Sequence, residues 1–227
     1  MSDTTGTAAP AWPGVYPALV TDLRDPQALG RVQVSLPWAA DPEGSRPVAW
    51  ARLATLAAGA GSGTWFLPAV GDEVLVAFQA GDPSLPVVLG GLWNGQQRPP
   101  QAVAADGSNH HRVIRSPRGV VIDLVDGPGR AGLTLRTPGG CELVLDDASQ
   151  EVRLSDGQGN QVEIKNGELR VTAAKAVVVS ASKVSIAAGS VQVDTGMLKV
   201  SGTVQADTLI ANSVVARSYT PGAGNVL

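Results

Sequence analysis

The chain has 227 residues and a formal net charge of −3, and 44% of its residues are hydrophobic but only 4% aromatic. This balance provides no strong attraction to nucleic acid or to an anionic membrane surface, so we expect no nucleic-acid partner. The one cysteine, Cys141, excludes an intrachain disulfide framework and fits assembly in a reducing cytoplasm. We expect it to be a small buried residue at the start of a strand.

Two kinds of sequence follow one another along the chain. Eight of the nine aromatic residues lie between Trp12 and Trp93, and no proline occurs between Gly139 and Thr220. The first part can therefore build a compact core on large side chains, whereas the second is uniform and rich in β-branched residues. Residues 1–13 are small and polar without the pattern of a signal peptide, and we expect a flexible N-terminus there.

Short strands are predicted throughout residues 14–95. The predicted strands are residues 15–20, 31–36, 48–53, 73–78 and 86–90, and apolar and polar residues alternate strictly over residues 31–36. In the second of these strands, Val32, Val34 and Leu36 are expected to point inward. The glycine-rich stretch from Ala57 to Gly63 is expected to be flexible. Five short strands with no helical period between them predict an all-β, five-stranded barrel of the OB type.

Residues 96–118 are polar and rich in turn-forming residues, which is typical of a linker. The two histidines of the chain, His110 and His111, lie in this stretch. A three-fold axis could bring six such imidazoles together around a metal ion, but a position in a linker favours solvated side chains. No other cluster indicates catalysis, a metal or a cofactor, so we expect a protein that is not an enzyme.

A repeat dominates the rest of the chain. Pairs of apolar residues two positions apart begin at Ile122, and their first members are spaced 11, 10, 9 and 10 residues apart as far as Val162. The spacing then tightens to 7, 8, 7, 7 and 7 residues. The pairs of the tight repeat, which we expect to form a trimer core, are Val162, Ile164, Leu169, Val171, Val177, Val179, Val184, Ile186, Val191, Val193, Leu198 and Val200.

Apolar residues two apart lie on one face of a strand, whereas a coiled-coil heptad places them three or four apart. One seven-residue repeat can supply only one strand and one corner, but a full turn of a β-helix needs about three of each. Three intertwined chains would supply the missing faces, so residues 119–217 are predicted to form a trimeric, triple-stranded β-helix spike. Burial of the twelve side chains would contribute about 18–36 kcal/mol gross per chain. A flat sheet or sandwich is the alternative.

Several short motifs of the first part occur in the same order as in a known family. They are Gly14–Ala18 (GVYPA), Leu29–Val34 (LGRVQV), Phe66–Pro68 (FLP), Val70–Val76 (VGDEVLV) and Pro86–Gly90 (PVVLG). Residues 14–95 thus resemble the OB domain of phage baseplate assembly protein V, of Vgr spike proteins of type VI secretion, and of spikes of extracellular contractile injection systems. The predicted trimeric spike agrees with this resemblance.

The resemblance implies a membrane-piercing central spike in a virion or phage tail-like particle that is assembled in the bacterial cytoplasm. It implies a homotrimer, a separate hub protein at the OB end, a PAAR-type tip protein at the other end and transient contact with a target membrane. The lysozyme domain of some members has no counterpart here. The C-terminal tip segment, residues 218–227, is expected to contact the tip protein through Tyr219, Thr220, Pro221, Gly222, Ala223 and Gly224.

A second hypothesis keeps the same fold but assigns it a different function. OB barrels often bind oligosaccharides or single-stranded nucleic acid, so the chain could be a ligand-binding module carried on a trimeric stalk. Exposed aromatic residues and basic side chains on the barrel would favour this alternative. The residues alone do not distinguish a phage from a secretion system or an extracellular injection particle.

Overall fold

The computed structural model describes residues 12–39 and 42–218. The chain divides into two units, Met1–Val177 and Val178–Leu227. Regular structure in the described residues is β, apart from two short 3₁₀ helices, η1 (Pro37–Ala39) and η2 (Gln79–Gly81). None of the described helices is long and apolar enough to cross a membrane.

The first part is a closed five-stranded barrel, which confirms the predicted barrel and its five strands. Its strands are β1 (Val15–Asp22), β2 (Val32–Ser35), β3 (Val48–Leu53), β6 (Glu73–Phe78) and β7 (Pro86–Gly91). They follow one another around the barrel in the order β1-β2-β3-β7-β6, and only β3 and β7 pair in parallel. This arrangement is consistent with an OB fold.

The barrel core is built from the inward residues of alternating strands. Val32 and Val34 are fully buried and Leu36 is 2% exposed, as the alternation predicted. Trp12 also packs against this core, with its ring centroid 5.0 Å from that of Phe78. Trp12, within the stretch that was expected to be flexible, thus finds an apolar partner on the barrel.

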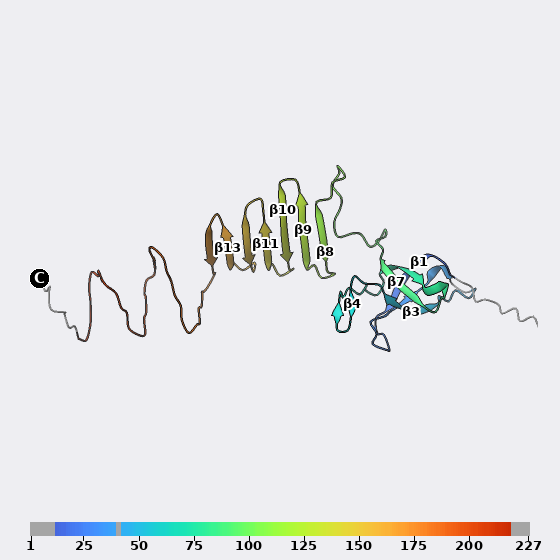
Figure 1. The fold of residues 1–227 in the computed structure, drawn as a ribbon, viewed down its shortest axis with the longest axis horizontal. Coiled ribbons are helices and arrows are strands. Elements are labelled where there is room, and N and C mark those ends of the chain that lie inside the picture. The colour runs from blue at the N-terminus through green and yellow to red at the C-terminus, as the bar shows by residue number, and fades with distance from the viewer. Residues whose placement is uncertain (1–11, 40–41, 219–227) are drawn as a thin grey trace, which may run out of the picture. The chain divides into compact units, whose positions relative to one another are not determined.

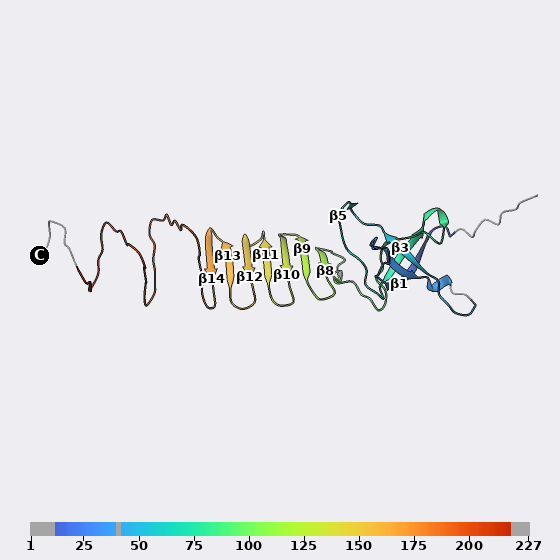
Figure 2. The same cartoon turned by 90° about the horizontal axis from the view of Figure 1, so that it is seen from below.

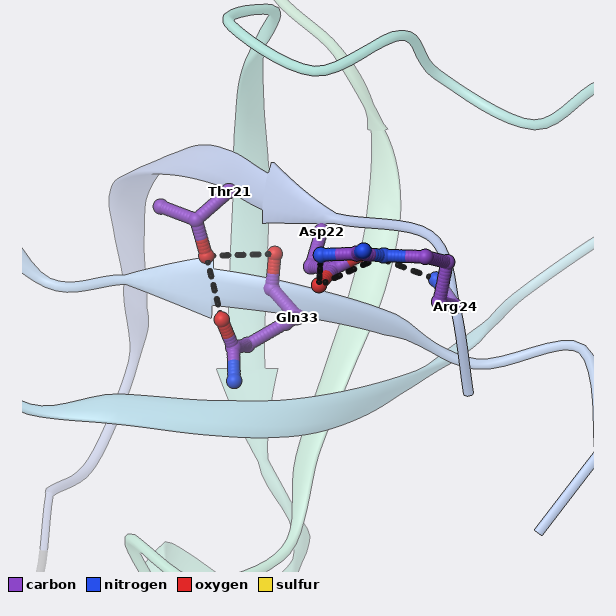
Figure 3. A network of polar contacts seen from close by, with 4 residues as sticks. All are labelled: Thr21, Asp22, Arg24 and Gln33. Atoms are coloured by element: carbon purple, nitrogen blue, oxygen red, sulfur yellow. Dashed lines mark hydrogen bonds and ion pairs between the residues drawn. The ribbon is translucent and has the colours of Figure 1, made fainter. Parts of the chain in front are cut away.

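Polar contacts fix the connection between β1 and β2 (Figure 3). The hydroxyl of Thr21 donates a hydrogen bond to Gln33 Oε1 at 2.9 Å, and Arg24 forms an ion pair with Asp22 at 2.7 Å. This ion pair holds the pKa of Asp22 well below its ordinary range. The Thr21–Gln33 hydrogen bond lies where the pairing of the two strands shifts register, and it links the end of β1 to β2.

An ion pair closes the turn between the same two strands. Arg31 binds Asp25 at 2.7 Å, and the Asp25 side chain is only 4% exposed. The same carboxylate accepts hydrogen bonds from the backbone N–H groups of Gln27, Leu29 and Arg31. The hydrogen bond from Arg31, and then these backbone bonds, hold the pKa of Asp25 well below its ordinary range.

A short arm, residues 54–66, follows β3. It contains β4 (Ala58–Gly59) and β5 (Ser62–Gly63), which pair with each other as an antiparallel hairpin. We predicted a flexible stretch here, and the structure instead shows defined turns. Gly63 has φ +141°, and a Cβ at this position would lie 2.3 Å from the carbonyl oxygen of Ala57, so the hairpin requires glycine.

The second part of the chain contains a seven-stranded antiparallel sheet (Figures 1 and 2). Its strands are β8 (His111–Arg115), β9 (Val121–Gly127), β10 (Arg130–Arg136), β11 (Glu142–Asp146), β12 (Glu151–Ser155), β13 (Gln161–Lys165) and β14 (Glu168–Thr172). Each strand pairs with the next one in the sequence, so the sheet is a simple meander with β8 and β14 at its edges.

This sheet corrects one predicted boundary. Residues 96–118 were expected to be a linker, but β8 lies inside this range and pairs with β9, with Ile114 opposite Ile122. The strand forms because Val113 and Ile114 can pack on the two faces of the sheet, although polar residues surround them. Residues 173–218 contain no described strand or helix, and their trace runs back and forth (Figure 1).

Candidate assembly interface

One face of the sheet carries two continuous rows of apolar side chains. Residues that lie directly opposite each other on paired strands share a face, so the pairing defines the rows. The first row is Ile114, Ile122, Leu135, Leu143, Leu154, Val162 and Val171. The second row is Leu124, Leu133, Leu145, Val152, Ile164 and Leu169. We call these thirteen residues the apolar stripe.

The apolar stripe is not covered by any other part of the described chain. Ten of its residues are exposed, with values from 36% for Ile122 to 64% for Leu169. The other three, on β10 and β11, are half-buried. Proteins rarely leave a contiguous apolar surface of this kind in water, which makes the stripe a candidate interface.

The opposite face of the sheet carries several ion pairs. Arg153 on β12 forms ion pairs with Glu142 at 3.1 Å and with Glu151 at 3.1 Å, and Lys165 on β13 binds Glu151 at 3.0 Å. The hydrogen bond from Lys165 lowers the pKa of Glu151, and the same bond raises the pKa of Lys165. The sheet therefore has one face whose ion pairs are compatible with solvent and one apolar face that is not covered within the described chain.

The twelve residues predicted for the trimer core divide between two environments. Val162, Ile164, Leu169 and Val171 belong to the apolar stripe, where Val162 lies opposite Val171 and Ile164 opposite Leu169. The other eight lie in the second part of the repeat: Val177, Val179, Val184, Ile186, Val191, Val193, Leu198 and Val200. These eight are between 51% and 71% exposed.

The segment that carries those eight residues has no fold of its own in the described chain. All residues from Ala174 to Ser218 are exposed, and none belongs to a strand or helix. Its apolar pairs therefore have no cover, and its backbone belongs to no intrachain ladder.

His111 lies in β8 and not in a loop, which corrects the expectation of a linker position for this residue, whereas His110 immediately precedes the strand. The Nδ1 atom of His111, in β8, lies 3.0 Å from Asp123 Oδ1 on the neighbouring strand, and the His111 side chain is 37% exposed. The Nδ1 atom of His110 lies 3.2 Å from the carbonyl oxygen of Asp126. No group of three or more His, Cys, Asp or Glu residues that could hold a metal ion occurs in the described part of the chain.

Two further expectations concern Cys141 and the predicted tip contact. Cys141 is exposed instead of buried, because it lies in the turn before β11 and not inside the strand. The predicted tip contact, Tyr219 to Gly224, lies outside the described residues.

Sequence reasoning also missed apolar surface on the barrel. Leu56 is 96% exposed, and Trp65 and Phe66 are each 72% exposed, all on the arm. A signal was present in the sequence, since no charged residue occurs from Leu53 to Gly71.

Comparisons with known proteins agree with the barrel. Residues 16–93 match the family model of the type VI secretion system/phage-baseplate injector OB domain. The type VI secretion system spike protein VgrG1a of Pseudomonas aeruginosa is 32% identical over 91 residues, which are 40% of this chain and 14% of VgrG1a. The spike protein VgrG3 of Vibrio cholerae is 35% identical over 75 residues, which are 33% of this chain and 7% of VgrG3.

One relative matches beyond the barrel. The actin cross-linking toxin VgrG1 of Vibrio cholerae is 26% identical over 174 residues, which are 75% of this chain and 15% of the toxin. The chain thus matches only a small fraction of the length of these relatives. The matches confirm the resemblance to baseplate and Vgr-like spike proteins, and the part that carries it most clearly is the injector OB domain of residues 16–93.

Proposed function

We propose that three copies of this chain form the central spike of a contractile phage tail or contractile injection system. The observation that carries the proposal is the apolar stripe, together with the exposed apolar pairs that follow it from Val177 to Val200. Three copies can turn these surfaces toward a common axis and leave the charged face of each sheet in water. The similarity of the barrel to injector OB domains supports the same assignment.

The repeat fits a long, narrow and rigid element. From β8 to β14 each strand is joined to the next by a short turn, and the following repeat is shorter still. In a trimeric β-helix the segment from Ala174 to Ser218 would find its strand partners in neighbouring copies. Continuous backbone pairing without long loops provides the stiffness that a piercing device needs.

We assign the two ends of the spike to different partners. The barrel would attach to a separate hub protein, and residues 218–227 would carry a PAAR-type tip protein. The spike would contact the target membrane transiently when the sheath contracts. Its role is mechanical, and we assign it no catalytic reaction. It would be assembled in the bacterial cytoplasm and become part of the particle.

The ligand-binding alternative has a specific surface to consider. A cleft of about 1040 Å³ lies along the arm and is lined by Leu29, Leu53, Trp65 and Phe66, among others. Its only charged lining residue is Arg52. Proteins that bind single strands follow the backbone with several basic groups, so this cleft favours apolar contact over nucleic acid.

The test is the mass of the full chain in solution. Native mass spectrometry and light scattering are expected to give a trimer of 23.2 kDa subunits with no stable monomer. A folded monomer at micromolar concentration would exclude the proposal. An electron micrograph of the host particle with this chain labelled provides the second test, since the label should lie on the particle axis.

A further inference from the structure

The arm of the barrel presents large apolar side chains to water. Leu56, Trp65 and Phe66 are each at least 72% exposed, although the barrel core beside them is complete. Isolated exposed leucines are common on protein surfaces, but three large apolar residues on one thirteen-residue element are not. The arm is therefore a candidate for contact with another chain.

The arm has a defined shape in the single chain. The N–H of Ala54 donates to the carbonyl of Val88 at 2.8 Å, and the N–H of Thr64 donates to the carbonyl of Ala57 at 3.0 Å. Trp65 lies so close to Gly30 that a Cβ at that glycine would be 3.1 Å from the indole ring. The exposure of the arm is thus not the property of an unstructured loop.

The charge distribution indicates which chain covers the arm. The stretch from Leu53 to Gly71 contains no charged residue, and Arg52 and Asp72 flank it. At a three-fold axis identical side chains from three copies meet, so a charged residue there would face two like charges. An uncharged apolar segment such as the arm can converge on such an axis without this repulsion. The apolar stripe is uncharged in the same way.

We propose that the arms of three copies contact one another at the three-fold axis, with Leu56 and Phe66 in the contact. The partner is a second and a third copy of this chain. This inference rests on the trimer of the proposed function and goes beyond it. The apolar stripe alone would hold the C-terminal regions together while leaving the three barrels independent, whereas joined arms would fix the barrels to one another.

Cross-linking of single cysteines in the full-length chain tests the contact. Replacement of Cys141 by serine (Cys141→Ser) removes the one native thiol, and Leu56→Cys then places a thiol on the arm. The control is Leu85→Cys in the same background, because Leu85 is 48% exposed on the barrel but lies outside the arm. Each variant is first weighed by native mass spectrometry and then oxidised, and its products are separated without reductant.

We expect Leu56→Cys to give a covalent dimer, because three converging thiols allow one disulfide per trimer. We expect almost no covalent dimer for Leu85→Cys. A trimer in which the Leu56→Cys thiol forms no disulfide and reacts with a maleimide as fast as the Leu85→Cys thiol would overturn the inference and leave the proposed function intact. A trimer whose thiols cross-link only after a hub protein is added would likewise overturn it. A monomer would overturn both proposals.

Discussion

The barrel and the seven-stranded sheet use the same strand chemistry with opposite results. In the barrel, Val32, Val34, Val74 and Val76 are fully buried, because the strands close on themselves. In the sheet, equivalent alternating residues form the apolar stripe and mostly remain exposed, because the meander has two free edges and no second layer covers it in the described part of the chain. Alternation therefore specifies that a strand has an apolar face, and the topology decides whether the same chain covers it.

The largest expected effect comes from charge placed in the uncovered repeat. In the trimer proposed here, Val184→Asp together with Ile186→Asp would bring six carboxylates near the axis, so we expect complete loss of the trimer by native mass spectrometry. Ser185→Asp is the matched control, since its side chain alternates to the other face of the strand and should leave the trimer intact. A soluble trimer of the double variant would show that these residues point outward.

A cavity in the barrel tests the other region. Leu36→Ala removes a side chain that is 2% exposed and should lower the free energy of unfolding of the barrel by about 2–5 kcal/mol. Denaturant titration followed by tryptophan fluorescence measures this loss. Leu29→Ala, at a residue that is 68% exposed, should change it far less. We expect both variants to remain trimeric, and dissociation of the Leu36→Ala trimer would show that the two regions do not fold independently.

Acid should weaken the barrel through the turn after β1. The pKa of Asp25 is lowered in the folded state, so its ion pair with Arg31 stabilises the barrel fully at pH values above the ordinary carboxyl pKa. This stabilisation is lost as the pH falls below the ordinary pKa and then through the lowered pKa of the folded state. At pH 7, Asp25→Asn should lower the free energy of unfolding by less than Leu36→Ala does. Its melting temperature should also decline less between pH 7 and pH 3 than that of the unchanged protein. An unchanged decline in this variant would assign the acid sensitivity to other carboxylates.

The smallest effect is expected on the charged face of the sheet. Arg153→Gln removes the ion pairs with Glu142 and Glu151, whose side chains remain partly accessible to water. Such pairs are weak and screened by salt, so the change in melting temperature should be slight at low salt and vanish in 0.5 M NaCl, a concentration at which the Debye length is about 4–5 Å. A large loss that persists in salt would mean that this face is also covered.

The sequence predicted the barrel well because its signals are local. Strict alternation at residues 31–36 defines both a strand and its inward side chains. The tight repeat likewise predicted apolar pairs correctly on β13 and β14. In these segments alternate residues define the apolar face of each strand, and turn-forming residues separate one strand from the next.

The remaining features depend on neighbours that a local pattern does not reveal. β8 was missed because His111, Arg112 and Arg115 conceal its short apolar pattern, and the strand is defined by pairing with β9. The hairpin of the arm depends on the conformation of Gly63, whereas the glycine-rich composition of this stretch suggested only that it is flexible. Nothing in the described part of the chain covers the apolar stripe, so a local pattern does not reveal its partner.

The direction of pairing in the seven-stranded sheet has a mechanical consequence. Neighbouring strands stack along the direction of their hydrogen bonds, so the seven strands extend for about 29 Å along it. A thrust along this direction presses N–H and C=O groups together over the whole width of each strand. A pull from the end of β14 instead peels the hairpins apart one after another, beginning at the free edge. Such a sheet resists being driven forward better than being drawn back.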